Sequence, residues 1–78
     1  IRELISWEET KRMLADIGAD PVSKIMKTNV YATSSEDSVE DASKLMIRHK
    51  INRLPVVDNG TLVGIVTRGD IVRGLAEI

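Results

Sequence analysis

Two stretches that lie close together in the chain decide the fold: INRLPVVD at residues 51–58 and LVGIVTRGDIV at residues 62–72. The apolar part of the first predicts a short strand, with Pro55 at or near a sheet edge because proline donates no ladder hydrogen bond. Asn59-Gly60 predicts a tight turn, since both residues tolerate positive φ. The apolar run of the second predicts a returning strand buried on both faces, in which Gly64 indicates a close backbone approach.

Helices are predicted on both sides of this hairpin. Downstream, a helix is expected from Arg68 toward Ile78. Upstream, Ser38 is suited to cap a helix over residues 38–50, whose acidic first turn and basic last turn both suit the helix dipole. Before that helix, residues 30–33 predict a short extended strand.

The first part of the chain predicts further helices. Over residues 1–18, Ser6 and Glu9 have the spacing of a capping box. Pro21 suits the first turn of a short helix. We therefore divide the chain into an N-terminal helix or linker at residues 1–20 and one domain at residues 21–78. The apolar side chains of the N-terminal segment that we expect to be buried against the domain or a partner chain are Leu4, Trp7, Met13, Leu14 and Ile17.

Length and composition restrict the class of protein. The chain has 78 residues, no Cys, a single His and a net charge of −1. A domain this small is marginally stable alone, and disulfides are excluded, so a partner chain or a neighbouring domain is the expected support. The near-neutral charge argues against a nucleic-acid binder. No apolar run approaches a membrane span of roughly 20 residues and no signal peptide is visible, so the cytoplasm is the expected location.

Few residues are suited to catalysis, and we expect a protein that is not an enzyme. The only histidine, His49, falls on the apolar side of a predicted helix, which is typical of a core or rim histidine. The sequence contains no HExxH, P-loop or GxGxxG motif. The acidic pairs Glu36-Asp37 and Glu40-Asp41 are interpreted as a solvated helix start, with a divalent ion as the weaker alternative.

The informative motif is Thr67-Arg68-Gly69-Asp70, where a buried strand runs into a helix. Thr67 and Asp70 have the spacing of a capping-box variant, and the motif alone favours that interpretation. The same geometry suits a ligand, because a helix start attracts phosphate and a carboxylate accepts hydrogen bonds from ribose hydroxyls. Arg53, just before a buried strand, either lies on the surface or points at such a phosphate. The two interpretations do not exclude each other.

With these motifs the chain, from Pro21 onward, resembles a cystathionine-β-synthase (CBS) domain, the half-unit of a Bateman module. The resemblance is carried by INRLPVVD, by LVGIVTRGDIV and by the V..IM pattern that starts at Val22. Ser35 departs from the family, which often has proline there. The resemblance implies an α+β fold: a β-α-β-β-α unit with a small mixed sheet and two helices on one face. It also implies that two units pack through their sheets.

The resemblance further implies a regulatory module that binds an adenosyl compound such as AMP, ADP, ATP or S-adenosylmethionine, and that senses energy or metabolite levels. Carried over by position, Asp70 would bind the ribose hydroxyls and Thr67 the ribose or phosphate. Arg53 and Asn52 would face phosphate. The residues that would form the adenine slot are Thr28, Val30, Tyr31, Ile51 and Pro55.

Three hypotheses of function remain open. The leading one is adenosyl-ligand binding in a cleft between paired units, and the rival is a pure dimerisation module with an empty cleft. Both expect a homodimer or a second CBS unit, because one unit should expose an aliphatic sheet face. Nucleic-acid binding through Arg48, Lys50 and Arg53 is the weakest, since three basic residues release few counterions. The ligand and the regulated protein are not identified by the sequence.

Overall fold

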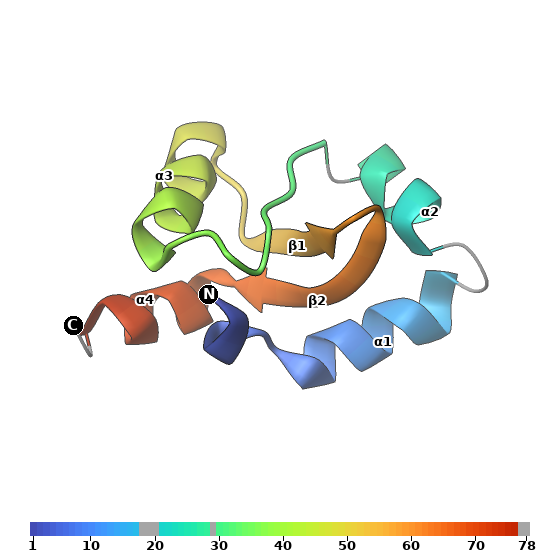
Figure 1. Ribbon diagram of the computed structural model, residues 1–78, viewed down its shortest axis with the longest axis horizontal. Coiled ribbons are helices and arrows are strands. Elements are labelled where there is room, and N and C mark those ends of the chain that lie inside the picture. Colours follow the sequence, from blue (N-terminus) through green and yellow to red (C-terminus); the bar gives the residue numbers. More distant parts are fainter. Residues whose placement is uncertain (18–20, 29, 77–78) are drawn as a thin grey trace.

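The computed structural model describes residues 1–17, 21–28 and 30–76 of the chain (Figure 1). A two-stranded antiparallel sheet lies at the centre with helices around it, which confirms the expected α+β class. The elements in chain order are η1 (Arg2–Leu4), α1 (Trp7–Ile17), α2 (Pro21–Thr28), α3 (Val39–His49), β1 (Arg53–Asp58), β2 (Thr61–Thr67) and α4 (Arg68–Ala76).

The hairpin forms as predicted. β1 and β2 pair from Arg53 opposite Thr67 at the open end to Asp58 opposite Thr61 at the turn, with an irregularity after Val56. The turn contains Asn59-Gly60, with φ of 50° and 76°, which is the left-handed region that these two residues tolerate.

The strand predicted over residues 30–33 is wrong in extent: of these four residues only Thr33 pairs with the sheet, in a single parallel bridge to Val56. The Thr33 N–H donates to the Pro55 carbonyl at 2.9 Å, and the Val57 N–H donates to the Thr33 carbonyl at 2.8 Å. The next bond of a parallel ladder would run from the N–H of residue 55 to the carbonyl of Tyr31. Because residue 55 is proline, that bond cannot form and the ladder stops.

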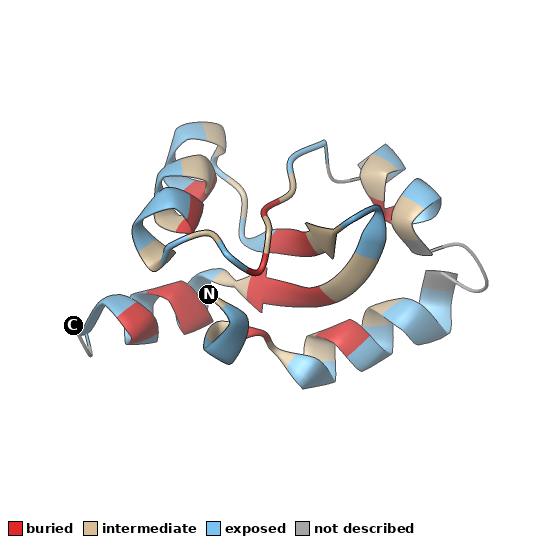
Figure 2. Ribbon diagram, in the orientation of Figure 1, coloured by how far each residue is buried: buried red, intermediate tan, exposed pale blue. Residues whose placement is uncertain are grey.

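The core lies between the sheet and the last two helices. Residues at alternate strand positions point to one face of the sheet, where they meet side chains from α3 and α4, so these two helices cover one face as expected. Figure 2 shows the buried positions on both strands and on these two helices. The helix caps follow the predicted chemistry: the Ser38 hydroxyl accepts the Asp41 N–H at 3.0 Å. The buried cluster consists of Ile5, Ala42, Met46, Leu54, Val56, Val66 and Ile71.

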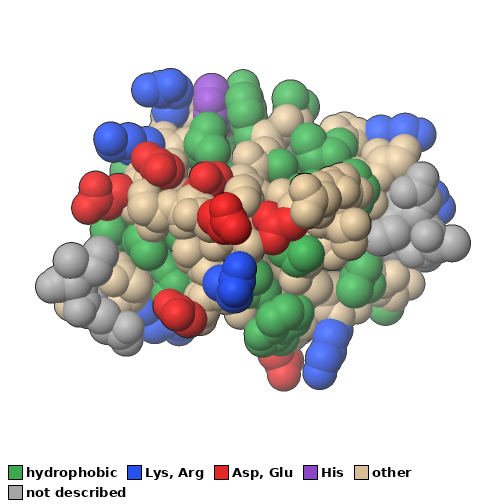
Figure 3. Space-filling model, viewed as in Figure 1, with side chains coloured by type: hydrophobic (Ala, Val, Ile, Leu, Met, Phe, Trp, Pro, Cys, Tyr) green, Lys and Arg blue, Asp and Glu red, His purple; other side chains and the backbone are tan. Residues whose placement is uncertain are grey.

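The aliphatic sheet face that we expected to be exposed is instead covered by the chain itself. Pro55 and Ile65, which face each other across the hairpin and point away from α3, are fully buried. Ile25 of α2, the helix that packs against β2, is also fully buried. Exposed hydrophobic side chains lie among charged groups on the helices and loops (Figure 3). The large ones are Trp7, Leu14, Val30, Tyr31, Ile47, Val72 and Leu75.

The N-terminal segment packs on the outer edge of β2 through hydrogen bonds of Ser6 and Thr10, which were not among the residues that we predicted. The Ser6 N–H donates to the Ile65 carbonyl at 2.7 Å. The buried Thr10 hydroxyl accepts the Ile65 N–H at 2.9 Å and donates to the Ser6 carbonyl at 2.8 Å. Trp7 is 58% exposed and Leu14 39% exposed, so for these two residues the first alternative, burial against the domain, is wrong.

Two apolar side chains before α1 do pack on the domain. Ile5 is buried against Gly64, where an added Cβ would lie 2.3 Å from the Ile5 Cγ2 atom, and the close approach predicted at this glycine is therefore confirmed. Leu4 is partly buried against Gly74 of α4, so its predicted packing on the domain is confirmed, and Met13 of α1 is half-buried. The Ile17 side chain lies outside the described part, as does Gly18.

Candidate functional site

Several of the predicted site residues meet at the open end of the hairpin, where β1 and α4 begin and β2 ends. Arg53 and Thr67 are partners in the strand register. The Arg68 N–H donates to the carbonyl of Asn52 at 2.8 Å, which ties the start of α4 to the segment before β1. Asp70 lies in the first turn of α4. Asn52, Arg53, Thr67 and Asp70 therefore belong to one junction.

Thr67 and Asp70 form a reciprocal pair, which confirms the capping interpretation. The Thr67 hydroxyl donates to Asp70 Oδ2 at 2.7 Å, and the Thr67 N–H donates to the same oxygen at 3.3 Å. The Asp70 N–H donates back to Thr67 Oγ1 at 3.3 Å. The other carboxylate oxygen, Oδ1, pairs with the guanidinium of Arg73, one turn further along α4. Asp70 is thus a buried carboxylate with a partner on each oxygen.

Arg73 was not among the predicted site residues, although its three-residue spacing from Asp70 on one helix is a usable signal. Its side chain is 74% exposed, whereas that of Asp70 is only 12% exposed. An exposed cation therefore covers one oxygen of a buried carboxylate. Such a cation can be exchanged for another donor at small cost.

Arg53 lies on the surface and has an unexpected partner. Its side chain is 55% exposed, and its Nε atom lies 3.5 Å from Oε2 of Glu9 in α1. This pair could not be predicted from the sequence, because α1 is positioned only by tertiary packing. The pair is long and its Arg53 side is half exposed, so it contributes little to stability.

The residues predicted for the adenine slot differ in how far they are exposed to solvent. The ring of Tyr31 stacks on His49 at the end of α3, with 3.6 Å between centroids and 11° between planes, and Val30 is 72% exposed. Ile51 is half buried. Pro55 is fully buried, and its carbonyl holds Thr33. Thr28 ends α2, and its side chain lies outside the described part.

A cluster of hydrogen bonds holds the loop that runs from Tyr31 to the start of α3. The Ser35 N–H and the Ser34 hydroxyl each donate to Asp58 Oδ1 at 2.9 Å, and the Ser35 hydroxyl donates to Oδ2. These bonds, the Ser35 hydroxyl first, lower the pKa of Asp58. Ser35 stands where the resembled family often has proline, and a proline could donate neither of its bonds.

Asp37 holds the same loop from the other side. It accepts the Ser34 N–H at 2.9 Å and the Thr33 hydroxyl at 2.5 Å. The backbone bond, followed by the hydroxyl bond, lowers the pKa of Asp37. Asp37 is therefore a loop anchor rather than part of a solvated helix start. Over the described residues, no group of three or more His, Asp or Glu side chains is arranged to hold a metal ion.

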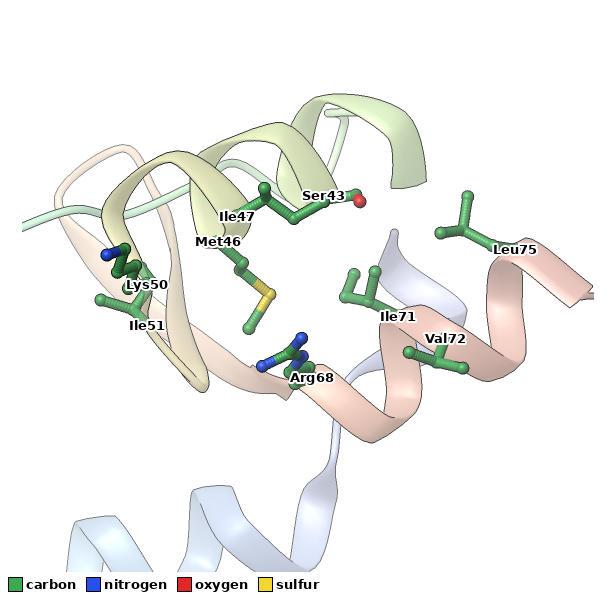
Figure 4. Close-up of a pocket in the computed structure, with 9 residues that line it drawn as sticks. All are labelled: Ser43, Met46, Ile47, Lys50, Ile51, Arg68, Ile71, Val72 and Leu75. Carbon is green, nitrogen blue, oxygen red and sulfur yellow. The ribbon is translucent and has the colours of Figure 1, made fainter.

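A separate apolar groove lies between α3 and α4 (Figure 4). Its volume is about 410 Å³. Met46 points from α3 toward α4, and Ile71 and Val72 of α4 lie opposite. Of the predicted site residues only Ile51 belongs to it, so the groove and the junction are different places. The groove is lined by Ser43, Met46, Ile47, Lys50, Ile51, Arg68, Ile71, Val72 and Leu75.

Comparison with known proteins gives consistent results. The profile of the CBS domain family matches residues 22–77. The CBS domain-containing protein YhcV of Bacillus subtilis is 50% identical over 54 residues, which are 69% of this chain and 39% of YhcV. The chloroplastic CBS domain-containing protein CBSX1 of Arabidopsis thaliana is 34% identical over 74 residues, 94% of this chain and 31% of CBSX1. The chain thus spans well under half of these relatives.

A solved structure of the same kind contains a nucleotide. The crystal structure of CBSX2 in complex with AMP is matched with a TM-score of 0.58 and 43% sequence identity, over 62% of this chain and 34% of that one. Within the described residues, no helix is both long and apolar enough to cross a membrane.

Proposed function

The chain belongs to the CBS domain family, and from that membership we propose that it is a non-catalytic regulatory module that binds an adenosyl compound: AMP, ADP, ATP or S-adenosylmethionine. The observation that carries the proposal is the buried Asp70 carboxylate, held by Thr67 at the start of α4 beside the exposed Arg53. The AMP in the CBSX2 crystal structure supports this class of ligand.

In the proposed complex, Asp70 keeps its bonds from Thr67 and exchanges Arg73 for a ribose hydroxyl. Thr67 lies beside the ribose, and Arg53 and Asn52 face the phosphate. The adenine lies against Tyr31 and Val30, with Thr28, Ile51 and Pro55 completing the slot through side-chain or backbone atoms. Breaking the ion pairs of these two arginines costs little free energy, because the side chain of Arg73 is 74% exposed and that of Arg53 is 55% exposed.

Titration calorimetry with AMP, ATP and S-adenosylmethionine tests the proposal, and Asp70→Ala identifies the site. Hydrogen bonds to charged groups contribute about 1.5–3 kcal/mol, so the AMP affinity should fall roughly 10- to 100-fold. Wild type should prefer AMP to 2′-deoxy-AMP, and the variant should hardly distinguish them. Equal discrimination by both proteins would remove Asp70 from the ribose site.

The matched control is Ser38→Ala. It removes the cap of α3, in which the Ser38 hydroxyl accepts the Asp41 N–H at 3.0 Å, at a distance from the junction. Loss of either cap should cost about 1 kcal/mol of stability. Ser38→Ala should therefore lower the melting temperature without changing the AMP affinity, which separates binding from folding.

The α3/α4 groove favours a second candidate function, that of a dimerisation module, in which the chain pairs with a second copy of itself or with another CBS unit. Ile47 is 71% exposed and Val72 58% exposed at its rim, and Leu75 adds further apolar surface. We propose that a second unit covers this groove. Ile47→Asp should shift sedimentation at micromolar concentration toward monomer, whereas Leu14→Asp, on α1 outside the groove, should not. A wild type that sediments only as monomer would exclude the homodimer.

A further inference from the structure

Tyr31 and His49 are the only tyrosine and the only histidine of the chain, and their rings are stacked. The backbone at Tyr31 lies beyond the point where the parallel bridge ends, because Pro55 cannot extend the ladder toward it. Among the described residues, the stack with His49 is the only ring or hydrogen-bond contact of the Tyr31 side chain. The direction of the phenol ring therefore depends on its neighbour.

His49, in contrast, is fixed by its own backbone. It is the last residue of α3, a helix held in the core through Ala42 and Met46. The following residue, Lys50, adopts φ of 54° and caps the helix, with its N–H directed at the Ile47 and Met46 carbonyls. The imidazole thus projects from a rigid helix end, and the tyrosine on the loop rests on it.

We infer that His49 is a positioning residue, which holds the ring of Tyr31 as a flat wall against which the base of the ligand stacks. The inference rests on the function proposed above and adds to it a residue that does not itself need to contact the ligand. One face of the phenol is covered by imidazole, while Tyr31 as a whole remains 38% exposed. A half-covered aromatic ring is a suitable platform, because aromatic rings stack on any base.

A double-mutant cycle measured by AMP titration tests the coupling. Tyr31→Ala should weaken AMP binding about 5- to 100-fold, the range expected for loss of one base stack. His49→Ala should weaken it by a smaller factor, and should have no further effect in the Tyr31→Ala background. An equal effect of His49→Ala in both backgrounds would overturn the inference.

Two more variants separate positioning from other roles of the histidine. His49→Phe keeps a flat ring and removes the nitrogens, so it should restore most of the AMP affinity. Failure of His49→Phe to restore it, in a variant as stable as wild type, would overturn the inference in favour of a direct hydrogen bond or charge. Arg48→Ala, at the adjacent exposed position of α3, is the control for a general effect of altering the helix end, and should leave the affinity unchanged.

Proton NMR gives a readout that stability alone would not change, because each ring has one set of signals. In the free protein the ring protons of Tyr31 should show ring-current shifts that disappear in His49→Ala. During AMP titration the Tyr31 signals should shift with the dissociation constant found by calorimetry. Wild type that binds AMP with unmoved Tyr31 signals overturns this inference alone, whereas wild type that binds no adenosyl compound overturns the proposed function as well.

Discussion

Replacing Gly64 by alanine should destabilise the protein, because the space beside this glycine is filled by Ile5. A Cβ at position 64 would lie 2.3 Å from Ile5 Cγ2, 3.0 Å from Cδ1 and 3.1 Å from Cγ1. Ile5 is only 8% exposed and belongs to the core cluster, so it cannot turn away without moving the segment before α1. Overpacking of this kind costs about 1–3 kcal/mol.

A strand alanine recovers part of that cost, since glycine is less favourable than alanine inside a strand by about 0.5–1 kcal/mol. The expected net loss is about 1–2 kcal/mol. For a domain of this size, each kcal/mol corresponds to about 4–8 °C in melting temperature. Urea unfolding followed by far-ultraviolet circular dichroism measures the change directly.

Gly69 in the first turn of α4 provides the matched control. A Cβ there would have Thr67 Oγ1, at 3.9 Å, as its nearest neighbour, which is ordinary contact. Gly69→Ala should therefore stabilise the protein by up to about 1 kcal/mol through helix propensity.

The background variant Ile5→Ala removes the obstacle, so Gly64→Ala should be neutral or stabilising in that background. The reasoning is refuted if Gly64→Ala is as stable as Gly69→Ala, or if its cost is the same with and without Ile5.

Three other outcomes follow from the described contacts. The lowered pKa values of Asp37 and Asp58 mean that their contribution to stability is present above the unfolded pKa of about 3.9, and is lost as the pH falls through the lower folded values. Unfolding free energy should thus fall steeply below about pH 4, and less steeply in Asp58→Asn; identical pH profiles would contradict this. Glu9→Gln removes the ion pair with Arg53 and should raise AMP affinity by up to about fivefold, which corresponds to the free energy of a half-exposed ion pair. An unchanged or lower affinity in calorimetry would count against a contact between Arg53 and the phosphate. Thr10→Val leaves a buried β2 amide without its acceptor and should cost about 1–3 kcal/mol in urea unfolding, so an unaltered unfolding midpoint would show that the bond contributes nothing.

The sequence predicted the elements whose causes are local. The hairpin followed from turn chemistry at Asn59-Gly60 between two apolar runs, and the α3 cap followed from Ser38 alone. The Thr67–Asp70 pair was predictable because its partners are three residues apart where β2 ends and α4 begins. Each of these depends on residues only a few positions apart.

Features that depend on distant partners could not be predicted in this way. The strand at residues 30–33 failed because its ladder needed an N–H from Pro55. Helical periodicity groups Trp7 with Leu14, but does not say which side of α1 docks. The helix docks through hydrogen bonds from its start to the backbone of β2. The Arg53–Glu9 pair is unpredictable for the same reason.

The hydrogen bonds on the two outer edges of the hairpin have a consequence for colloidal behaviour. Thr33 occupies the outer edge of β1, while Ser6 and Thr10 occupy the N–H and carbonyl of Ile65 on the outer edge of β2. An open edge is a template on which strands of other molecules add, and from which cross-β aggregates grow. The N-terminal segment therefore protects an aliphatic strand from intermolecular pairing. Deletion of residues 1–10 should remove both bonds to Ile65 and make the domain aggregate as its concentration is raised.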